Sequence, residues 1–158
     1  NSALVKGVNR AWDAGLVVVV AAGNNGPRTM SITTPGISRK VITVGCSDDD
    51  REVLVGGNRM VDYSGRGPTA ACICKPDLVA PGCSVVSCSS RADKYTIKSG
   101  TSMSTPIVSG AVALLLERFP DMSNKDVKLR LRESSVDIGL PRNQQGWGLL
   151  DVGKMIGK

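Results

Sequence analysis

The run Leu16–Val20 constrains the fold more than any other segment, because it consists of one leucine followed by four valines. Such a run is apolar on both faces and largely β-branched, which is typical of a strand buried between helices in a parallel sheet. The segment that follows, Ala21–Pro27, is rich in small and turn-forming residues and ends the strand in a loop. We therefore predict a central parallel strand over Leu16–Val20.

A helix is predicted directly before this strand. Either Asn1 or Ser2 can cap its N-terminus, and Gly15 lies where a C′ glycine ends a helix. The apolar residues of this segment recur at helical spacing on one face: Leu4, Val5, Val8, Ala11 and Trp12. A helix, a short turn and a buried strand form half of a βαβ unit, so the pattern indicates an α/β fold.

Further strands are expected at three places. Val41–Gly45 is predicted to be a second buried strand, and Val85–Cys88 and Tyr95–Ile97 to be shorter strands. Asp48–Arg51 is predicted to be a solvated turn. Its three adjacent aspartates lack the spaced ligand pattern of a calcium loop, so we expect no calcium there. The Gly- and Pro-rich segment Tyr63–Gly82 is expected to be a long, ordered surface loop.

The C-terminal part of the chain has helical patterns. Ile107–Phe119 is small or apolar around most of its circumference, which predicts a buried helix, with Pro106 in or near its opening turns. Ser123–Asp126 is close to a capping box and is expected to open another helix. A short helix ending at Ile156 is expected to close the chain, and we treat residues 1–158 as one unit.

Composition excludes several classes of function. Hydrophobic residues make up 41% and charged residues 22%, which is ordinary for a soluble globular protein. The net charge is +6, but the basic residues are scattered and are not interleaved with aromatic residues, so we expect a solvated basic surface and no nucleic-acid interface. The longest apolar stretch, Leu16–Ala22, is too short to cross a bilayer, so we expect no membrane partner.

The cysteines give a weak indication of the compartment. The chain has five cysteines, an odd number that cannot pair completely within it, and no histidine to complete a zinc site. We therefore expect free, mostly buried thiols and no metal site built from side chains. Free thiols favour a reducing, cytoplasmic setting.

Two residues could supply chemistry. Asn24 follows the first strand, at the carboxyl end where ligands bind open parallel sheets, and its amide could face a developing negative charge. Ser102 lies at the mouth of a buried helix, whose free N–H groups and dipole would stabilise an oxyanion. Taken singly, Asn24 could equally be a turn residue and Ser102 a helix cap.

Together, the segments resemble the subtilase family of serine peptidases. Gly100–Pro106 matches the family's nucleophile signature and Ala21–Asn24 its oxyanion asparagine segment. Intervening and closing signatures are matched in the same order by Ser64–Thr69, Lys75–Gly82 and, more loosely, Gly146–Val152. The resemblance implies a three-layer α/β/α subtilisin-like fold with a mostly parallel sheet, of which this chain would be the C-terminal portion.

The resemblance also implies roles for particular residues. Ser102 would be the nucleophile, and the Asn24 side chain and the Ser102 backbone N–H would form the oxyanion hole. Residues that would contact substrate follow in the same way: Ala21, Ala22 and Gly23 in one pocket wall, Gly36 near its floor, and Ser99 and Gly100 at the edge of the cleft. Protein or peptide substrates are expected, and no cofactor is required. Structural calcium is an option that the family allows, partly through backbone carbonyls near Gly36–Val41.

The sequence departs from the family pattern because it contains no histidine. In the family, the catalytic aspartate and histidine precede the part matched here, so we expect them on an N-terminal half outside this chain. Three hypotheses follow: part of an active serine endopeptidase, a pseudoprotease that binds peptides or proteins through the inherited cleft, or a separate structural module. We favour the first because Asn24 and Ser102 are both intact, and we expect the chain alone to be inactive. The resemblance favours secretion, whereas the free thiols favour the cytoplasm. We favour a bacterial source.

Overall fold

The computed structural model describes residues 2–90 and 94–157. Asn1, one of the two cap candidates, lies outside the described residues, while Ser2 caps the first helix by accepting the Leu4 N–H. In chain order the elements are α1 (Ala3–Asp13), β1 (Val19–Ala21), β2 (Ile42–Cys46), β3 (Val53–Val55), β4 (Asn58–Met60), β5 (Leu78–Ala80), β6 (Val85–Cys88), β7 (Tyr95–Lys98), α2 (Thr101–Arg118), α3 (Asn124–Ser134), α4 (Arg142–Gln145) and α5 (Val152–Ile156).

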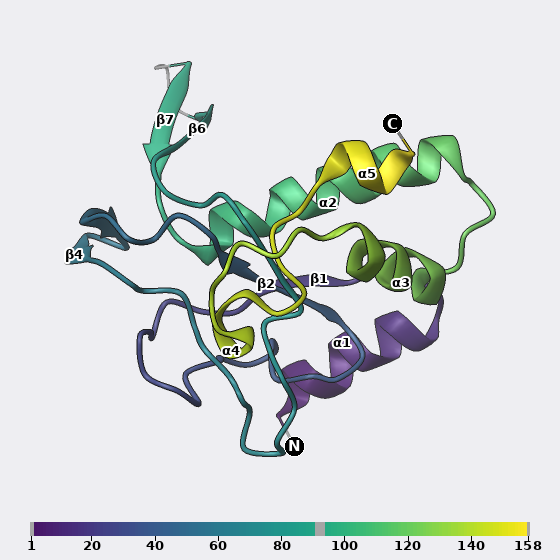
Figure 1. The fold of residues 1–158 in the computed structure, drawn as a ribbon, viewed down its shortest axis with the longest axis horizontal. Helices are drawn as coiled ribbons and strands as arrows, with labels where there is room; N and C mark the ends of the chain where they lie inside the picture. The colour runs from purple at the N-terminus through teal and green to yellow at the C-terminus, as the bar shows by residue number, and fades with distance from the viewer. Residues whose placement is uncertain (1, 91–93, 158) are drawn as a thin grey trace.

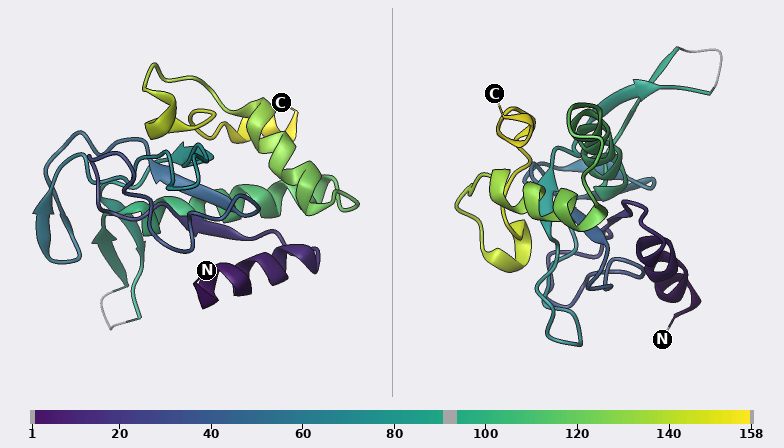
Figure 2. Two further views of the ribbon diagram at one scale, coloured as in Figure 1. Left: turned by 90° about the horizontal axis from the view of Figure 1, so that it is seen from below. Right: turned by 90° about the vertical axis from the view of Figure 1, so that its right-hand side faces the viewer.

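The centre of the fold is a parallel sheet in the order β1, β2, β5, in which Val20 pairs with Thr43 and Gly45 with Val79. Helix α2 packs against all three strands. Figures 1 and 2 show α1 on the opposite side of β1 and β2 from α2. The core joins apolar side chains of the sheet and of the helices, among them Ile42, Leu78 and Leu115. This arrangement confirms the α/β fold and its parallel sheet.

Strand β1 differs from its prediction in place and in extent. It covers Val19–Ala21 instead of Leu16–Val20, and it is the edge strand of the described sheet instead of a central one. Its residues are half-buried, whereas those of β2 are fully buried. The Ala22 N–H donates to the Val44 carbonyl at 2.8 Å. Because backbone groups alternate in direction along a strand, those of Val19 and Ala21 point away from β2, toward the open edge.

The prediction of a surface loop over Tyr63–Gly82 is wrong in its later part. Residues 75–80 are buried, and Leu78–Ala80 forms strand β5 of the sheet. The charged residues Lys75 and Asp77 made this segment look solvated. They are buried because they pair with each other at 2.5 Å and because Lys75 also donates to the distant Val41 carbonyl, a contact that a local sequence pattern does not reveal.

Two antiparallel hairpins project from the sheet. β6 and β7 pair with each other, which confirms two predicted strands, whereas the hairpin β3–β4 has no counterpart among the predictions. The predicted solvated turn at Asp48–Arg51 is partly buried. The Asp49 carboxylate accepts the Ser64 N–H at 2.7 Å, and burial raises the pKa of Asp49.

Helix α2 begins at Thr101, before the apolar segment Ile107–Phe119, so Pro106 lies within its opening turns as predicted. Pro106 has no N–H for the Ser102 carbonyl one turn earlier, a loss that is tolerated close to a helix start. The capping box at Ser123 and Asp126 is confirmed at the start of α3, and α5 ends at Ile156 as predicted.

All five cysteines are free, in agreement with the prediction, but most of them are not buried. Cys46 is buried and Cys83 half-buried, whereas Cys72, Cys74 and Cys88 are exposed, because the last three lie in a loop and on a projecting hairpin. Burial raises the pKa of Cys46 to about 12. A thiol with such a high pKa is a poor nucleophile at neutral pH.

Candidate active site

Helix α2 starts at a glycine that no other residue could easily replace. Gly100 is the N-cap residue and has φ +137°, a conformation that side-chain-bearing residues rarely adopt. Its N–H donates to the Gly82 carbonyl at 2.9 Å. A Cβ atom on Gly100 would lie 3.3 Å from the Asn24 Nδ2 atom. Gly100 therefore lets the end of β1 and the start of α2 approach closely.

Asn24 is joined to the first residue of α2 through one side of its amide. The Oδ1 atom accepts hydrogen bonds from the Thr101 backbone N–H and from the Thr101 hydroxyl, each at 3.0 Å. The Thr101 hydroxyl in turn accepts the Gly23 N–H at 3.2 Å. With Oδ1 engaged, Nδ2 is the free end of the amide. The described residues offer it no acceptor, so it is available to a ligand.

Ser102 is exposed and is the second residue of α2. Its backbone N–H has no acceptor among the described residues, as expected in the first turn of a helix. Ser102 borders a hollow of about 470 Å³ together with Val19, Val20 and Ala21 of β1. A hydroxyl, a free N–H and a positive helix end therefore meet at an accessible place.

The structure places the other predicted substrate-contacting residues around this point. Ala21 borders the hollow beside Ser102, and Ala22 is fully buried behind it. Gly36 is also buried, and its carbonyl accepts the Thr43 hydroxyl at 2.8 Å. A Cβ atom on Gly36 would lie 2.9 Å from the Ala21 carbonyl oxygen, so Gly36 lies next to the end of β1. Ser99 accepts the Ser84 N–H at 2.9 Å. The roles of these residues stay predictions.

Thr101 is the residue that the sequence analysis did not single out. Its hydroxyl links the Gly23 N–H to the Asn24 Oδ1 atom, and so fixes which end of the Asn24 amide faces outward. The only signal in the sequence is a hydroxyl residue directly before Ser102. A local pattern would assign it to helix capping, since its partners lie 78 and 77 positions away in the chain.

Thr101 gives the first testable prediction. In the full-length protein, Thr101→Val should lower kcat roughly tenfold, since it removes one positioning hydrogen bond worth about 1.4 kcal/mol. Thr101→Ser should retain most of the activity because it keeps the hydroxyl. Steady-state kinetics on a peptide substrate measures both variants. An equal loss in the two variants would contradict this role, because Thr101→Ser keeps the hydroxyl that Thr101→Val removes.

A calcium ion does not fit the carbonyls near Gly36–Val41 together with the side chains that the structure places there. The Lys128 Nζ atom already binds successive carbonyl oxygens of this segment, at 3.0, 2.9 and 3.0 Å, those of Arg39, Lys40 and Val41. Calcium binds six to eight oxygen ligands and would be repelled by an ammonium group in the same cage. The cation at these carbonyls is therefore the chain's own lysine.

A second ammonium group belongs to the same cluster. The Lys75 Nζ atom donates to the Val41 carbonyl at 2.9 Å and to the Asp77 carboxylate at 2.5 Å. Asp77 also accepts the Thr43 N–H at 2.8 Å and lies 3.6 Å from the Lys128 Nζ atom. Burial lowers the pKa of Lys75 to about 8, although the neighbouring Asp77 carboxylate raises it. Asp77 is thus the shared counter-ion of two largely buried lysines.

Among the described residues, none of the helices is both long and apolar enough to cross a membrane.

The end of a parallel strand and the N-terminus of α2 thus meet through the bond between Asn24 and Thr101, one residue before the exposed Ser102. The chain belongs to the subtilase family, whose model matches residues 1–148.

Individual relatives agree with this assignment. The chain is 42% identical over 145 residues to serine protease AprX of Bacillus subtilis, covering 84% of this chain and 33% of that protein. It is 34% identical over 154 residues to subtilisin DY of Bacillus licheniformis, covering 96% of this chain and 51% of the relative. The solved structure of the prenylagaramide maturation protease PagA matches with a TM-score of 0.73 at 23% identity, over 96% of this chain and 53% of that one. The chain thus spans about half or less of these proteins, and the last match supports the fold alone.

Proposed function

We propose that this chain is the nucleophile-bearing portion of a serine endopeptidase domain. Ser102 would attack the carbonyl carbon of a peptide bond and form an acyl-enzyme, and water would then release the acyl group. The observation that carries the proposal is the contact between the Asn24 Oδ1 atom and Thr101, the residue directly before the exposed Ser102, which leaves the Asn24 Nδ2 atom without an acceptor among the described residues. Two donors of this kind stabilise the oxyanion of acyl transfer.

The proposal needs a general base, because a serine hydroxyl is a weak nucleophile without one. The chain has no histidine, so we infer that an aspartate and a histidine come from an N-terminal half of the same domain. Two observations support this inference: the matched relatives extend well beyond the aligned region, and β1 has an open edge where a further strand could pair. The portion described here should have no turnover by itself.

The compartment is part of the same proposal. One relative is a halolysin-like extracellular serine protease of Natrialba magadii, 33% identical over 87% of this chain. We infer from this likeness that the parent protein is secreted. Its exposed free thiols are unusual for a secreted protein, because thiols oxidise outside the cell.

A fluorophosphonate probe tests the proposed function in the full-length protein. The probe should label the unmodified protein covalently, and Ser102→Ala should abolish labelling, because only a base-activated serine reacts. Ser87→Ala is the matched control, since Ser87 is an exposed serine of β6 that does not border the hollow at Ser102 and should leave labelling unchanged. Intact protein that resists the probe but binds peptides would instead identify a pseudoprotease.

A further inference from the structure

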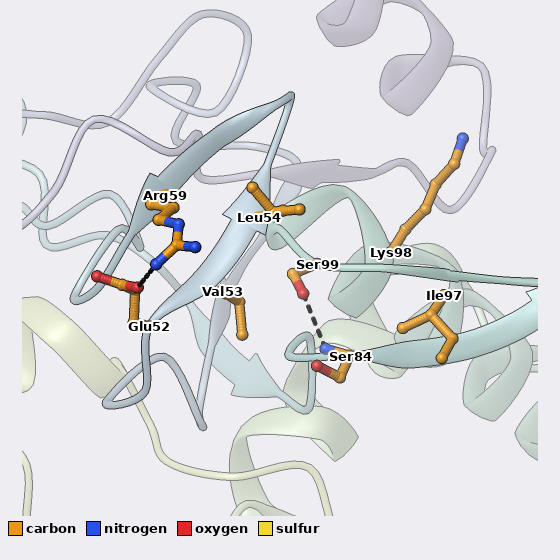
Figure 3. Close-up of a pocket in the computed structure, with 8 residues that line it drawn as sticks. All are labelled: Glu52, Val53, Leu54, Arg59, Ser84, Ile97, Lys98 and Ser99. Carbon is orange, nitrogen blue, oxygen red and sulfur yellow. Dashed lines mark hydrogen bonds and ion pairs between the residues drawn. The ribbon is translucent and has the colours of Figure 1, made fainter.

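A hollow of about 360 Å³ lies between the end of α1 and helix α3, and we call it the tryptophan hollow because both tryptophans of the chain border it. Its lining residues are Trp12, Lys125, Lys128, Leu129, Arg132 and Trp147. It shares no lining residue with the hollow beside Ser102, or with the hollow between the two hairpins that Figure 3 shows beside Ser99. The tryptophan hollow is thus a separate feature of the surface.

The tryptophan hollow lies at the opposite end of the parallel sheet from the candidate active site. The Lys128 Nζ atom contacts the carbonyl of Val41, the residue before β2, and the Trp147 N–H donates to the carbonyl of Asp77, the residue before β5, at 2.7 Å. Both contacts are at the amino ends of strands, whereas Asn24 follows the carboxyl end of β1. Since parallel strands run in one direction, their amino ends lie together, and a ligand bound there would leave Ser102 accessible.

The walls of the tryptophan hollow are held in place by hydrogen bonds within the fold. Asn124, the first residue of α3, is buried and donates through Nδ2 to the Trp12 carbonyl at 2.7 Å and to the Leu16 carbonyl at 3.1 Å. The Lys128 Nζ atom, which is bound to backbone carbonyls, lies 5.7 Å from the centre of the Trp12 ring. Because these groups are already fixed, a ligand would pay little to order them.

The hollow presents apolar surface to solvent. Leu129 of α3 is 53% exposed, and the Trp147 side chain is half-buried. A single exposed leucine is ordinary on a protein surface, but this one borders a hollow together with two indole rings. A large apolar side chain that covered Leu129 and Trp147 would gain free energy from the area removed from water.

Every charged residue at the tryptophan hollow is a cation. Lys125 and Arg132 are exposed there. Arg132 and Trp147 also border a neighbouring hollow of about 420 Å³, which the exposed Arg142 lines as well, so the two hollows adjoin. Among the described residues, no carboxylate lies within ion-pair distance of the Arg132 or the Arg142 guanidinium group. Both groups are therefore available to an anionic ligand.

Asp137 borders the neighbouring hollow but does not neutralise these arginines. Its Oδ1 atom accepts the Gly139 N–H at 2.8 Å and the Gln145 Nε2 group at 2.7 Å. These two hydrogen bonds, the one from Gly139 above all, lower the pKa of Asp137. The cations of the adjoining hollows outnumber this carboxylate, so their combined surface attracts negative charge.

We propose that the two adjoining hollows bind an acidic segment of a partner polypeptide. A large apolar side chain of that segment packs against Leu129 and Trp147, and carboxylates next to it in the segment pair with Arg132 and Arg142. A guanidinium group suits this role because it can bind a carboxylate through two parallel hydrogen bonds. The net charge of +6 also favours an acidic partner over a second copy of this chain. The proposal does not depend on catalysis at Ser102.

Fluorescence anisotropy tests the proposal with the full-length protein carrying Ser102→Ala, so that the probe is not cleaved. The probe is a labelled synthetic peptide with one leucine between two pairs of glutamates. It should bind saturably, and its Kd should rise roughly fivefold in Arg132→Gln and roughly fivefold in Leu129→Ser, because the first loses an ion pair and the second loses apolar contact. Lys6→Gln is the matched control, since Lys6 is an exposed cation of α1 that borders neither hollow, and it should leave Kd unchanged.

A second peptide, with glutamine in place of each glutamate, should bind at least roughly tenfold more weakly. Equal affinity for the two peptides would overturn the proposal, because charge would then play no part. An equal rise of Kd in Lys6→Gln and Arg132→Gln would overturn it too, since only the net charge of the protein would matter. The absence of saturable binding at millimolar peptide would have the same consequence. Displacement of the probe by an equal concentration of citrate, a small carboxylate without an apolar side chain, would identify a small-anion site instead.

Discussion

Asn24→Ala in the full-length protein should lower kcat by roughly 100- to 1,000-fold while KM changes little. This magnitude is the one known for removing the oxyanion asparagine of a subtilisin, a member of the same family, and is carried over here as an expectation. The physical reason is that Nδ2 meets a full negative charge only in the transition state, so its loss raises the barrier more than it weakens substrate binding. Steady-state kinetics on a peptide substrate measures the two parameters separately.

Asn25 supplies a control for this prediction. It is the adjacent asparagine, its side chain is exposed, and Asn25→Ala should leave kcat within about twofold. A variant of Asn24 that raises KM and keeps kcat would show that the amide binds the ground state, which contradicts the oxyanion role. Because Asn24 also holds Thr101, a thermal melt should accompany the kinetics to confirm that the variant is folded.

Asp77→Ala should destabilise the folded protein by about 3–5 kcal/mol, the cost of breaking a buried ion pair by removing one partner. The substitution would leave the Lys75 ammonium buried with only a carbonyl oxygen as partner, and would remove the acceptor of the Thr43 N–H. It would also take away the charge that raises the pKa of Lys75, so this lysine would lose its proton more easily in the folded state. Urea denaturation of the full-length protein measures the effect.

Asp13 provides the matched comparison. It pairs with Lys40 at 2.6 Å on the surface, where both side chains are about half exposed, so Asp13→Ala should cost at most about 1 kcal/mol. A similar loss of stability in the two variants would contradict the view that burial gives Asp77 its weight. If Asp77→Ala leaves the free energy of unfolding unchanged, Lys75 and Lys128 must bind water or other acceptors, and the ion cluster does not stabilise the fold.

The sequence predicted the elements whose patterns are local. The strand at Val41–Gly45 and the capping box at Ser123 need only neighbouring residues to be recognised, and both are present, while the valine-rich run yields a strand only over Val19–Ala21. Ser102 and Asn24 could be proposed because each carries its chemistry in a short motif. The structure adds the contact through Thr101 that brings them together.

The elements that were missed depend on distant contacts. Strand β5 is hidden because Lys75 and Asp77 are polar in the sequence, and only their mutual pairing and the carbonyl of Val41 allow their burial. The contact of Lys128 of α3 with the carbonyls of Arg39–Val41, which bears on the calcium option, is likewise absent from any local pattern. The position of β1 at the edge of the described sheet could not be predicted from its composition, because an apolar strand has the same composition at an edge as in the middle of a sheet.

The bond between Asn24 and Thr101 connects positions 77 residues apart, so the two halves of the candidate site come together only when the polypeptide between them has folded. During synthesis Asn24 emerges from the ribosome well before Thr101 and Ser102, so its amide stays without this partner until the later segment has been made and folded. Any chemistry at this site therefore depends on folding, and unfolding separates Asn24 from the start of α2 again.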